Sequence, residues 1–368
     1  MYTYYPALRF KQGEYRALSK MPVELLNNIE PRFIVPPSNE IDPELGRKPT
    51  KDEIGHISGE RIGKHWPFRR AFLDTQFIAE DVGDDGLRKL FARARSYNVN
   101  IVPVATLLDL HKPLYRDLQC PGGLKMALIV AYEDIDVDEI KAALETANLQ
   151  ASDCVFFLDF TGAPLDPEIA SGSISGIIEL VNEIGKWQKI VFQASNFPTK
   201  NTADHGSDKH IDRAEWKSFH SAMKDCSVTP NRIGYGDFGA DCAEINFPRG
   251  KSGGRAIRHI RYSTPSSTII FRGDKEGKDA QIMRDVCKRI VESPYYSGQS
   301  YSSADDHLFK VANSLVGPGN ASMWREWNTI HHLTLVVREL GALIGESYEK
   351  GTITEIEEQL SLLEDEEV

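Results

Sequence analysis

Eight short apolar runs, separated by a mean step of about 30 residues, constrain the fold of this chain more than any other feature. They lie at 4–10, 32–37, 70–78, 100–107, 126–132, 154–160, 189–195 and 232–238. Most of them are continuous rather than alternating, which is typical of strands that are buried on both faces of a parallel sheet.

Helical patterns separate these runs. Apolar residues recur at spacings of three and four in 14–27, 86–97, 136–147, 175–185 and 213–225, and a further helix is expected around 51–63. Alternating strands and helices imply right-handed crossovers, and eight strands are the number that closes a barrel. The competing fold is an open doubly wound sheet, but the glycine-rich turn that it needs after the first strand is absent, where the chain reads RFKQGEY. We therefore predict an α/β fold, a (β/α)8 TIM-like barrel.

The chain continues well beyond the eighth run. The segments RAIRHIRYS and STIIFRG predict a C-terminal β-hairpin around Thr264-Pro265-Ser266, and a helical extension follows at 279–291 and 324–343. We expect a barrel over 1–250, a hairpin and helices packed on the barrel over 251–348, and an acidic tail over 349–368 that frays.

Charge and composition exclude several classes of protein. The formal net charge of −11 disfavours nucleic acid and anionic membranes as partners. We expect no signal peptide at the N-terminus, because it lacks a basic segment followed by an apolar run, and no apolar stretch reaches the roughly 18 residues of a membrane span. The five cysteines contain no CxxC pair, so we expect reduced, mostly buried thiols in a cytoplasmic protein.

The C-terminal ends of barrel strands are where functional side chains gather. Asp74, Asp159 and Asp237 follow strands in the similar contexts FLDT, FLDF and YGDF, and Gln193 and Asn196 follow the seventh strand. Three carboxylates that face one cavity can bind a divalent metal or act as acid and base. The structural alternative is that they pair with Arg9, Lys11 or Arg272 in a buried polar cluster that closes the barrel.

A second candidate feature combines basic residues with a helix start. Arg9 and Lys11 precede Gln12-Gly13-Glu14, which predicts an anion-binding lip, or alternatively a Glu14 helix cap with paired bases. Arg261, Tyr262 and Arg272 lie at the ends of the hairpin, and arginine can grip phosphate or carboxylate with two hydrogen bonds, although exposed hairpin arginines are the simpler interpretation.

Adjacent histidines occur near the C-terminus. His331 and His332 point about 100° apart on a helix, so they do not form a metal pair on one face. We expect one of them to pack or hydrogen-bond and the other to face solvent.

The opening YYPALRFKQGEYRAL resembles the beta protein family, which is named after a phage protein. The later segments PRFIVPP, FLD, RYS, FRG and WREW…HHL extend the resemblance over roughly residues 2–340. The residues that match the family's signature are Lys11, Gln12, Gly13, Glu14, Arg261, Tyr262, Arg272 and Gly273. The resemblance implies occurrence in phages and bacteria, sometimes near predicted defence genes, and no established reaction.

These observations predict a charged pocket that binds or hydrolyses an anionic phosphoester or nucleotide, in antiviral defence or in a phage–host system. The predicted catalytic residues are Lys11, Glu14, Asp74, Asp159 and Asp237, with a divalent metal as the cofactor considered. The predicted ligand-binding residues are Arg9, Gln12, Gln193, Asn196, Arg261, Tyr262 and Arg272. The alternative is a non-catalytic scaffold for a protein partner, marked by exposed aromatic residues at Tyr295, Tyr296 and Tyr301.

Overall fold

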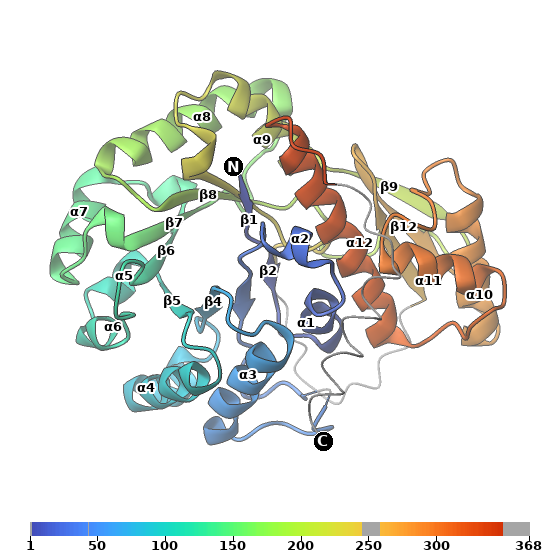
Figure 1. The fold of residues 1–368 in the computed structure, drawn as a ribbon, viewed down its shortest axis with the longest axis horizontal. Helices are drawn as coiled ribbons and strands as arrows, with labels where there is room; N and C mark the ends of the chain where they lie inside the picture. The colour runs from blue at the N-terminus through green and yellow to red at the C-terminus, as the bar shows by residue number, and fades with distance from the viewer. Residues whose placement is uncertain (1, 43, 245–257, 349–368) are drawn as a thin grey trace.

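A closed parallel sheet forms the centre of the computed structural model, which describes residues 2–42, 44–244 and 258–348 (Figure 1). The strands are β1 (Thr3–Tyr4), β2 (Ala7–Leu8), β3 (Arg32–Ile34), β4 (Ala71–Asp74), β5 (Ile101–Ala105), β6 (Met126–Ala131), β7 (Cys154–Asp159), β8 (Lys189–Gln193) and β10 (Ile233–Gly236). Their order is β1-β10-β8-β7-β6-β5-β4-β3-β2. Because β1 and β2 are two halves of the first predicted run, interrupted at Tyr5-Pro6, the sheet closes on itself. The predicted (β/α)8-like fold and all eight predicted strand positions are confirmed.

The barrel interior is a packed apolar core rather than a channel. Tyr5, Phe72 and Phe157 meet there with ring centroids 5.3 to 5.8 Å apart. At the C-terminal end of the strands, Phe238 joins Ala7 in a further buried cluster. Such a core fixes the strand ends in space, so polar side chains that follow the strands are held at defined positions.

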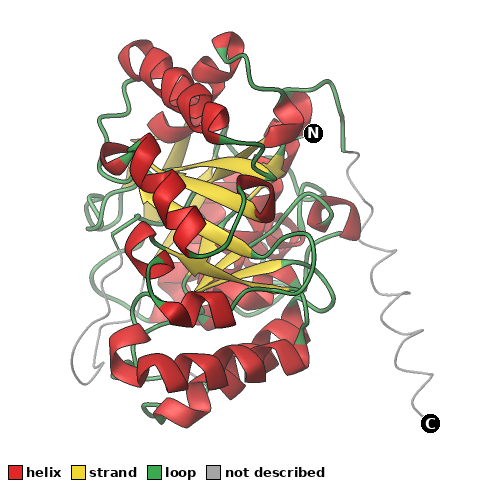
Figure 2. Ribbon diagram, turned by 90° about the vertical axis from the view of Figure 1, so that its left-hand side faces the viewer, coloured by secondary structure: helices red, strands yellow, loops and turns green. Residues whose placement is uncertain are grey.

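Helices surround the strands (Figure 2). Their bounds are α1 (Gln12–Leu18), α2 (Val23–Leu26), α3 (Lys51–His65), α4 (Ala79–Tyr97), α5 (Leu107–Leu110), α6 (Pro113–Asp117), α7 (Val137–Thr146), α8 (Pro167–Ile184), α9 (Ala214–Asp225), α10 (Asp279–Glu292), α11 (Ser303–Ala312) and α12 (Ala321–Ala342). The prediction of a single helix over 14–27 is wrong, because the structure has two helices there. The segment is divided into α1 and α2 because Pro22 cannot supply a backbone N–H inside a helix.

A small antiparallel sheet lies beside the barrel, in the order β11-β12-β9. The predicted hairpin is present as β11 (His259–Ser263) and β12 (Ser267–Arg272), and β9 (Asp208–Asp212) from the β8–α9 connection pairs with β12. Helix α12 contacts α1, β1 and β11, so it is covered by the barrel and by the small sheet (Figure 1). The expected boundary at 250 and the acidic tail lie outside the described residues.

Two further findings concern the chain as a whole. Within the described ranges, no helix combines the length and apolar character that crossing a membrane requires. All five cysteines are free, and Cys154, Cys242 and Cys287 are buried while the other two are half-buried.

Candidate functional site

The first strand delivers two cationic residues to the rim of the barrel. After β2, the backbone of Phe10 adopts a left-handed φ of 55°, which is uncommon outside glycine, and Lys11 is then the N-cap residue of α1. Helix α1 is held against α12 at Gly13, where an added Cβ would lie 2.5 Å from the carbonyl oxygen of Ser322. Only glycine allows this approach, which brings the start of α1 beside Arg325 of α12.

Three arginines converge on one buried carboxylate. Asp241 lies 3.3 Å from Arg9 Nη1, 2.6 Å from Arg261 Nη1 and 3.1 Å from Arg325 Nη1, as measured to its carboxylate oxygens. We call these four residues the arginine cluster. Glu14 joins it, because Oε2 accepts the backbone N–H of Arg9 at 2.5 Å and Oε1 lies 3.3 Å from Arg325 Nη1.

The charges of this cluster have clear electrostatic effects. Burial disfavours the charged form of Asp241, but Arg261, Arg9 and Arg325 outweigh burial and lower the pKa of the carboxyl well below its usual value. Burial, together with the positive charges of Arg261 and Arg325, lowers the pKa of the nearby His259 to about 3. The field around the cluster is therefore positive despite Asp241.

Lys11 differs from the arginines. Its side chain has no ion pair or hydrogen bond with any residue in the described part of the chain, and burial and Arg325 lower its pKa. It lines, together with Arg9, a hollow that holds about 40 Å3. We call this the proline hollow, because Pro36, Pro37 and Pro49 form its wall, with Glu40 also facing it.

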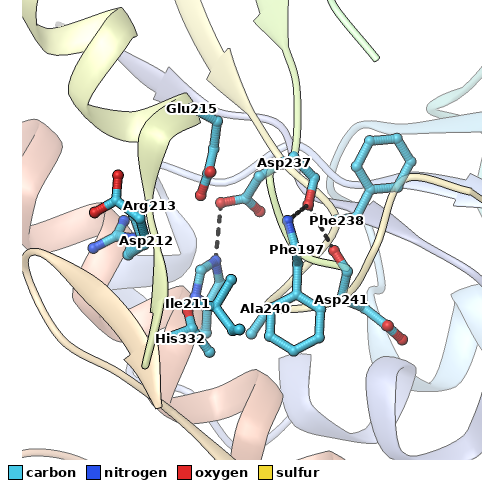
Figure 3. A pocket seen from close by; sticks show the side chains of 12 residues that line it. Phe197, Ile211, Asp212, Arg213, Glu215, Asp237, Phe238, Ala240, Asp241 and His332 are labelled. Carbon is cyan, nitrogen blue, oxygen red and sulfur yellow. Dashed lines mark hydrogen bonds and ion pairs between the residues drawn. The ribbon is translucent and has the colours of Figure 1, made fainter. Parts of the chain in front are cut away.

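Asp237 lies in a different pocket, shown in Figure 3. Its Oδ1 accepts hydrogen bonds from Tyr4 Oη at 2.5 Å and from the Gly239 N–H, and its Oδ2 lies 2.9 Å from His332 Nε2. Burial opposes ionisation of Asp237, but His332 and Tyr4 outweigh it and lower the pKa. The pocket measures about 10 Å3, the room of one water molecule. Glu215 also lines this pocket, and burial raises the pKa of Glu215 to about 7.

Asp74 is paired inside the barrel mouth. Its Oδ2 lies 3.1 Å from Arg32 Nη1, and the Arg32 guanidinium lies 5.7 Å from the ring of Phe157. Burial raises the pKa of Asp74, and the charge of Asp159 adds to this. Asp159 itself accepts the backbone N–H of Thr161.

The expectation of one shared pocket is not met. Asp237 lines the pocket of Figure 3 and Arg9 and Lys11 line the proline hollow, whereas Asp74, Asp159 and Arg272 line neither. Among the residues that the structure describes, no group of three or more histidine, cysteine, aspartate or glutamate side chains could hold a metal ion. The carboxylates that we considered as metal ligands therefore do not converge.

The other predicted site residues have local partners. Gln193 Nε2 donates to the Asp237 carbonyl at 3.1 Å, and Asn196 Nδ2 donates to the Asp212 carbonyl at 3.0 Å. Tyr262 Oη donates to Asp305 at 2.6 Å. The remaining two are Arg272, which donates to the Ala203 carbonyl, and Gln12, which bonds Glu44 and Ser322.

Both histidines of α12 are buried, so the prediction that one faces solvent is wrong. His331 bonds Asp305 and the Ser263 carbonyl, while His332 bonds Asp237 and Ser263 Oγ. The reason is that α12 is covered on both sides.

The aromatic patch expected at the surface is only partly exposed. Tyr295 is exposed, but Tyr296 donates to the Asp305 carbonyl and Tyr301 lies under the Arg338 guanidinium.

Sequence reasoning missed Asp241, Arg325 and Arg32. Asp241 lies past a strand end, in a loop where Gly239 and Ala240 both have left-handed φ values of 62° and 61°. Arg325 and Arg32 stand inside segments that we quoted for the family resemblance, WREW and PRFIVPP, and those segments were the available signal.

The chain is similar to known proteins in its sequence and in its fold. A family model described as "Beta protein" matches residues 4–338. No curated protein matches the chain. Among solved structures, the chain is similar to a glycoside hydrolase family 5 enzyme from Prevotella bryantii B14, with 10% identity, a TM-score of 0.37 and coverage of 63% of this chain and 80% of that one. It is also similar to the carboxyl transferase domain of Rhizobium etli pyruvate carboxylase, with 9% identity, a TM-score of 0.28 and coverage of 96% of this chain and 50% of that one. At these TM-scores neither likeness supports an argument about function.

Proposed function

Since the chain belongs to the Beta protein family, whose model matches residues 4–338, we propose a function for the rim on which the family-like segments meet. The rim binds a small anionic ligand of the phosphoester or nucleotide class. The ligand-binding residues are Arg9, Lys11, Arg261 and Arg325.

The main support for this proposal is that Lys11 is partly buried beside three arginines and has no partner among the described residues. The three arginines already share Asp241, yet a fourth cationic group is held beside them, partly buried and with no carboxylate partner in the described chain. Desolvating an ammonium group without a partner is costly, so such a group is typical of a site that is completed by a bound anion. Arginine and lysine together supply the forked and point-like contacts that phosphate groups accept.

Binding has stronger support than hydrolysis. Glu14 and Asp237, two of the predicted catalytic acids, have both carboxylate oxygens engaged by protein donors. A general acid or base needs to reach the reacting atom, and neither carboxylate is free to do so in this arrangement.

The family resemblance supports a place for this activity in antiviral defence or in a phage–host system, in the cytoplasm. The alternative, a scaffold for a protein partner, has weaker support because only Tyr295 of the three tyrosines considered for it is exposed.

Isothermal titration with inorganic pyrophosphate tests the proposal. We expect wild-type protein to bind, and Lys11→Met to weaken binding about tenfold, because a charge-assisted contact is worth about 1.5 kcal/mol or more. Among the described residues Lys11 has no ion-pair or hydrogen-bond partner to lose, so this variant should keep its fold.

Lys141→Met is the matched control, since Lys141 is exposed on α7, away from this rim. Absence of binding to the wild-type protein, or equal binding by Lys11→Met and wild type, would refute the proposal. Release of phosphate from a phosphoester by wild type but not by Lys11→Met would extend the proposal to hydrolysis.

A further inference from the structure

Two oppositely charged side chains face the proline hollow without pairing. Lys11 and Glu40 both line it, and burial raises the pKa of Glu40 while the positive charges of Lys11 and Arg9 partly oppose that rise. Yet no ion pair joins them, and Glu40 Oε2 is buried with no hydrogen-bond partner in the described chain. A buried carboxylate oxygen without a donor is costly, so it needs an explanation.

Asp42, the second carboxylate that lines the hollow, has the partners expected of a side chain with a structural role. Asp42 lies 2.7 Å from Arg61 Nη1 and also accepts the backbone N–H groups of Glu44 and Leu45. The Glu40 backbone N–H donates to the Pro37 carbonyl at 3.1 Å, so this part of the loop is held by a turn. The loop therefore holds Glu40 in position but leaves its carboxylate available.

We propose that the proline hollow binds a small zwitterion, whose anionic group contacts Lys11 and Arg9 and whose ammonium group donates to Glu40. This inference rests on the proposed function, because it assigns the second half of the same ligand. A ligand with both charges completes two unpaired protein groups at once. A simple anion would complete only Lys11 and would be repelled by Glu40.

The size and wall of the hollow agree with this class of ligand. A volume of about 40 Å3 accommodates about three groups of water size, which limits the ligand to a small one. The three proline rings supply an apolar wall with no N–H groups of their own, so the linker would lie against carbon while the two charged ends meet the polar residues.

A matched pair of probes tests this assignment. O-phosphoethanolamine and ethyl phosphate differ in the ammonium group, and both can be titrated calorimetrically into wild type, Glu40→Gln and the control Glu145→Gln. Glu145 is exposed on α7, so the control removes one negative charge at a distance from the hollow.

We expect opposite changes for the two probes. Glu40→Gln should bind O-phosphoethanolamine about tenfold more weakly than wild type, because a charge-assisted contact is lost. The same variant should bind ethyl phosphate about twofold more tightly, because a repelling charge is removed. Glu145→Gln should bind both probes as wild type does.

The outcomes separate the inference from the proposed function. If neither probe nor pyrophosphate binds wild type, the proposed anion site itself fails. If the probes bind but Glu40→Gln changes both affinities in the same direction, or neither, the anion site stands and the zwitterion assignment is overturned. Vesicles of phosphatidylethanolamine present similar groups on a membrane, and binding to them in place of the free compound would overturn the assignment of a small soluble ligand.

Discussion

Replacement of Asp241 by asparagine should destabilise the protein by about 3 kcal/mol. The side chain of Asp241 is 9% exposed and that of Arg9 is 6% exposed, so the pair is shielded from water, while Arg261 and Arg325 are only 18% and 22% exposed. Removing one partner of a buried ion pair costs about 3–5 kcal/mol. The lower end applies here because each arginine keeps a second acceptor: the carbonyl of Cys242 or Ala240, or the carboxylate of Glu14.

Urea denaturation with wild type, Asp241→Asn and Asp85→Asn measures this effect. The Asp85 side chain is 91% exposed and lies 3.0 Å from Arg88, so the same substitution there should cost less than about 1 kcal/mol. The slope of unfolding free energy against urea should be the same for all three proteins, so the midpoints report stability. A loss at Asp241 no larger than the loss at Asp85 would show that the arginine cluster is not an effective ion-pair network.

The difference in unfolding free energy between wild type and Asp241→Asn should depend on pH in one direction. The pKa of Asp241 is lowered in the folded protein, so its contribution is present above the unfolded value of about 3.9 and is lost as the pH falls below that value. The stability difference between wild type and Asp241→Asn should therefore be constant near neutral pH and shrink in acid below about pH 4. A difference that grows with acidification would contradict the assignment of Asp241 as the charged centre of the cluster.

Three further substitutions test other parts of the structure by urea denaturation. Gly13→Ala should cost about 1–3 kcal/mol, because the new Cβ would lie 2.5 Å from the Ser322 carbonyl oxygen; an unchanged midpoint would mean that α1 and α12 can separate freely. Phe68→Asn should raise stability by roughly 1 kcal/mol, because Phe68 is 88% exposed with a φ of 60°, a backbone conformation that asparagine adopts more readily. Glu215, whose folded-state pKa is raised to about 7, should make wild-type stability fall as the pH rises from about 4.3 to about 7, and Glu215→Gln should lack this fall; parallel pH curves would refute it.

The strands could be predicted because a barrel strand is buried on both faces. β7 illustrates this, since every residue from Cys154 to Leu158 is fully buried and the run is continuous in the sequence. β9 could not be found in the same way. It lies at the edge of the small sheet, most of its residues are exposed, and its sequence DKHID contains one apolar residue. An edge strand of this kind is specified by its partner β12 rather than by its own pattern.

The site could be predicted only in part, for a related reason. Strand position identified Arg9, Lys11 and Glu14, because these residues follow the first strand directly. Asp241 and Arg325 enter the same cluster from a loop and from α12, hundreds of residues along the chain, and no local pattern joins them. The approach of Arg325 depends on the contact between α1 and α12 at Gly13, which is a property of packed helices and not of sequence spacing.

The same packing separates polar residues that have partners in the protein from those that are open to a ligand. Several polar residues in the family-like segments have partners in the protein: Arg32 pairs with Asp74, Arg261 with Asp241, and His332 with Asp237. A residue that is occupied in this way can be required for the fold alone, so its presence in a motif says little about chemistry. Lys11 and Glu40 are different, because the described protein supplies neither with a side-chain partner although both are partly buried. Burying charge without a partner lowers stability, and a bound ligand that meets both groups would offset that cost.

Saturating O-phosphoethanolamine should therefore raise the urea midpoint of wild type but not that of the Lys11→Met, Glu40→Gln double variant. An equal rise in both proteins would place the ligand elsewhere.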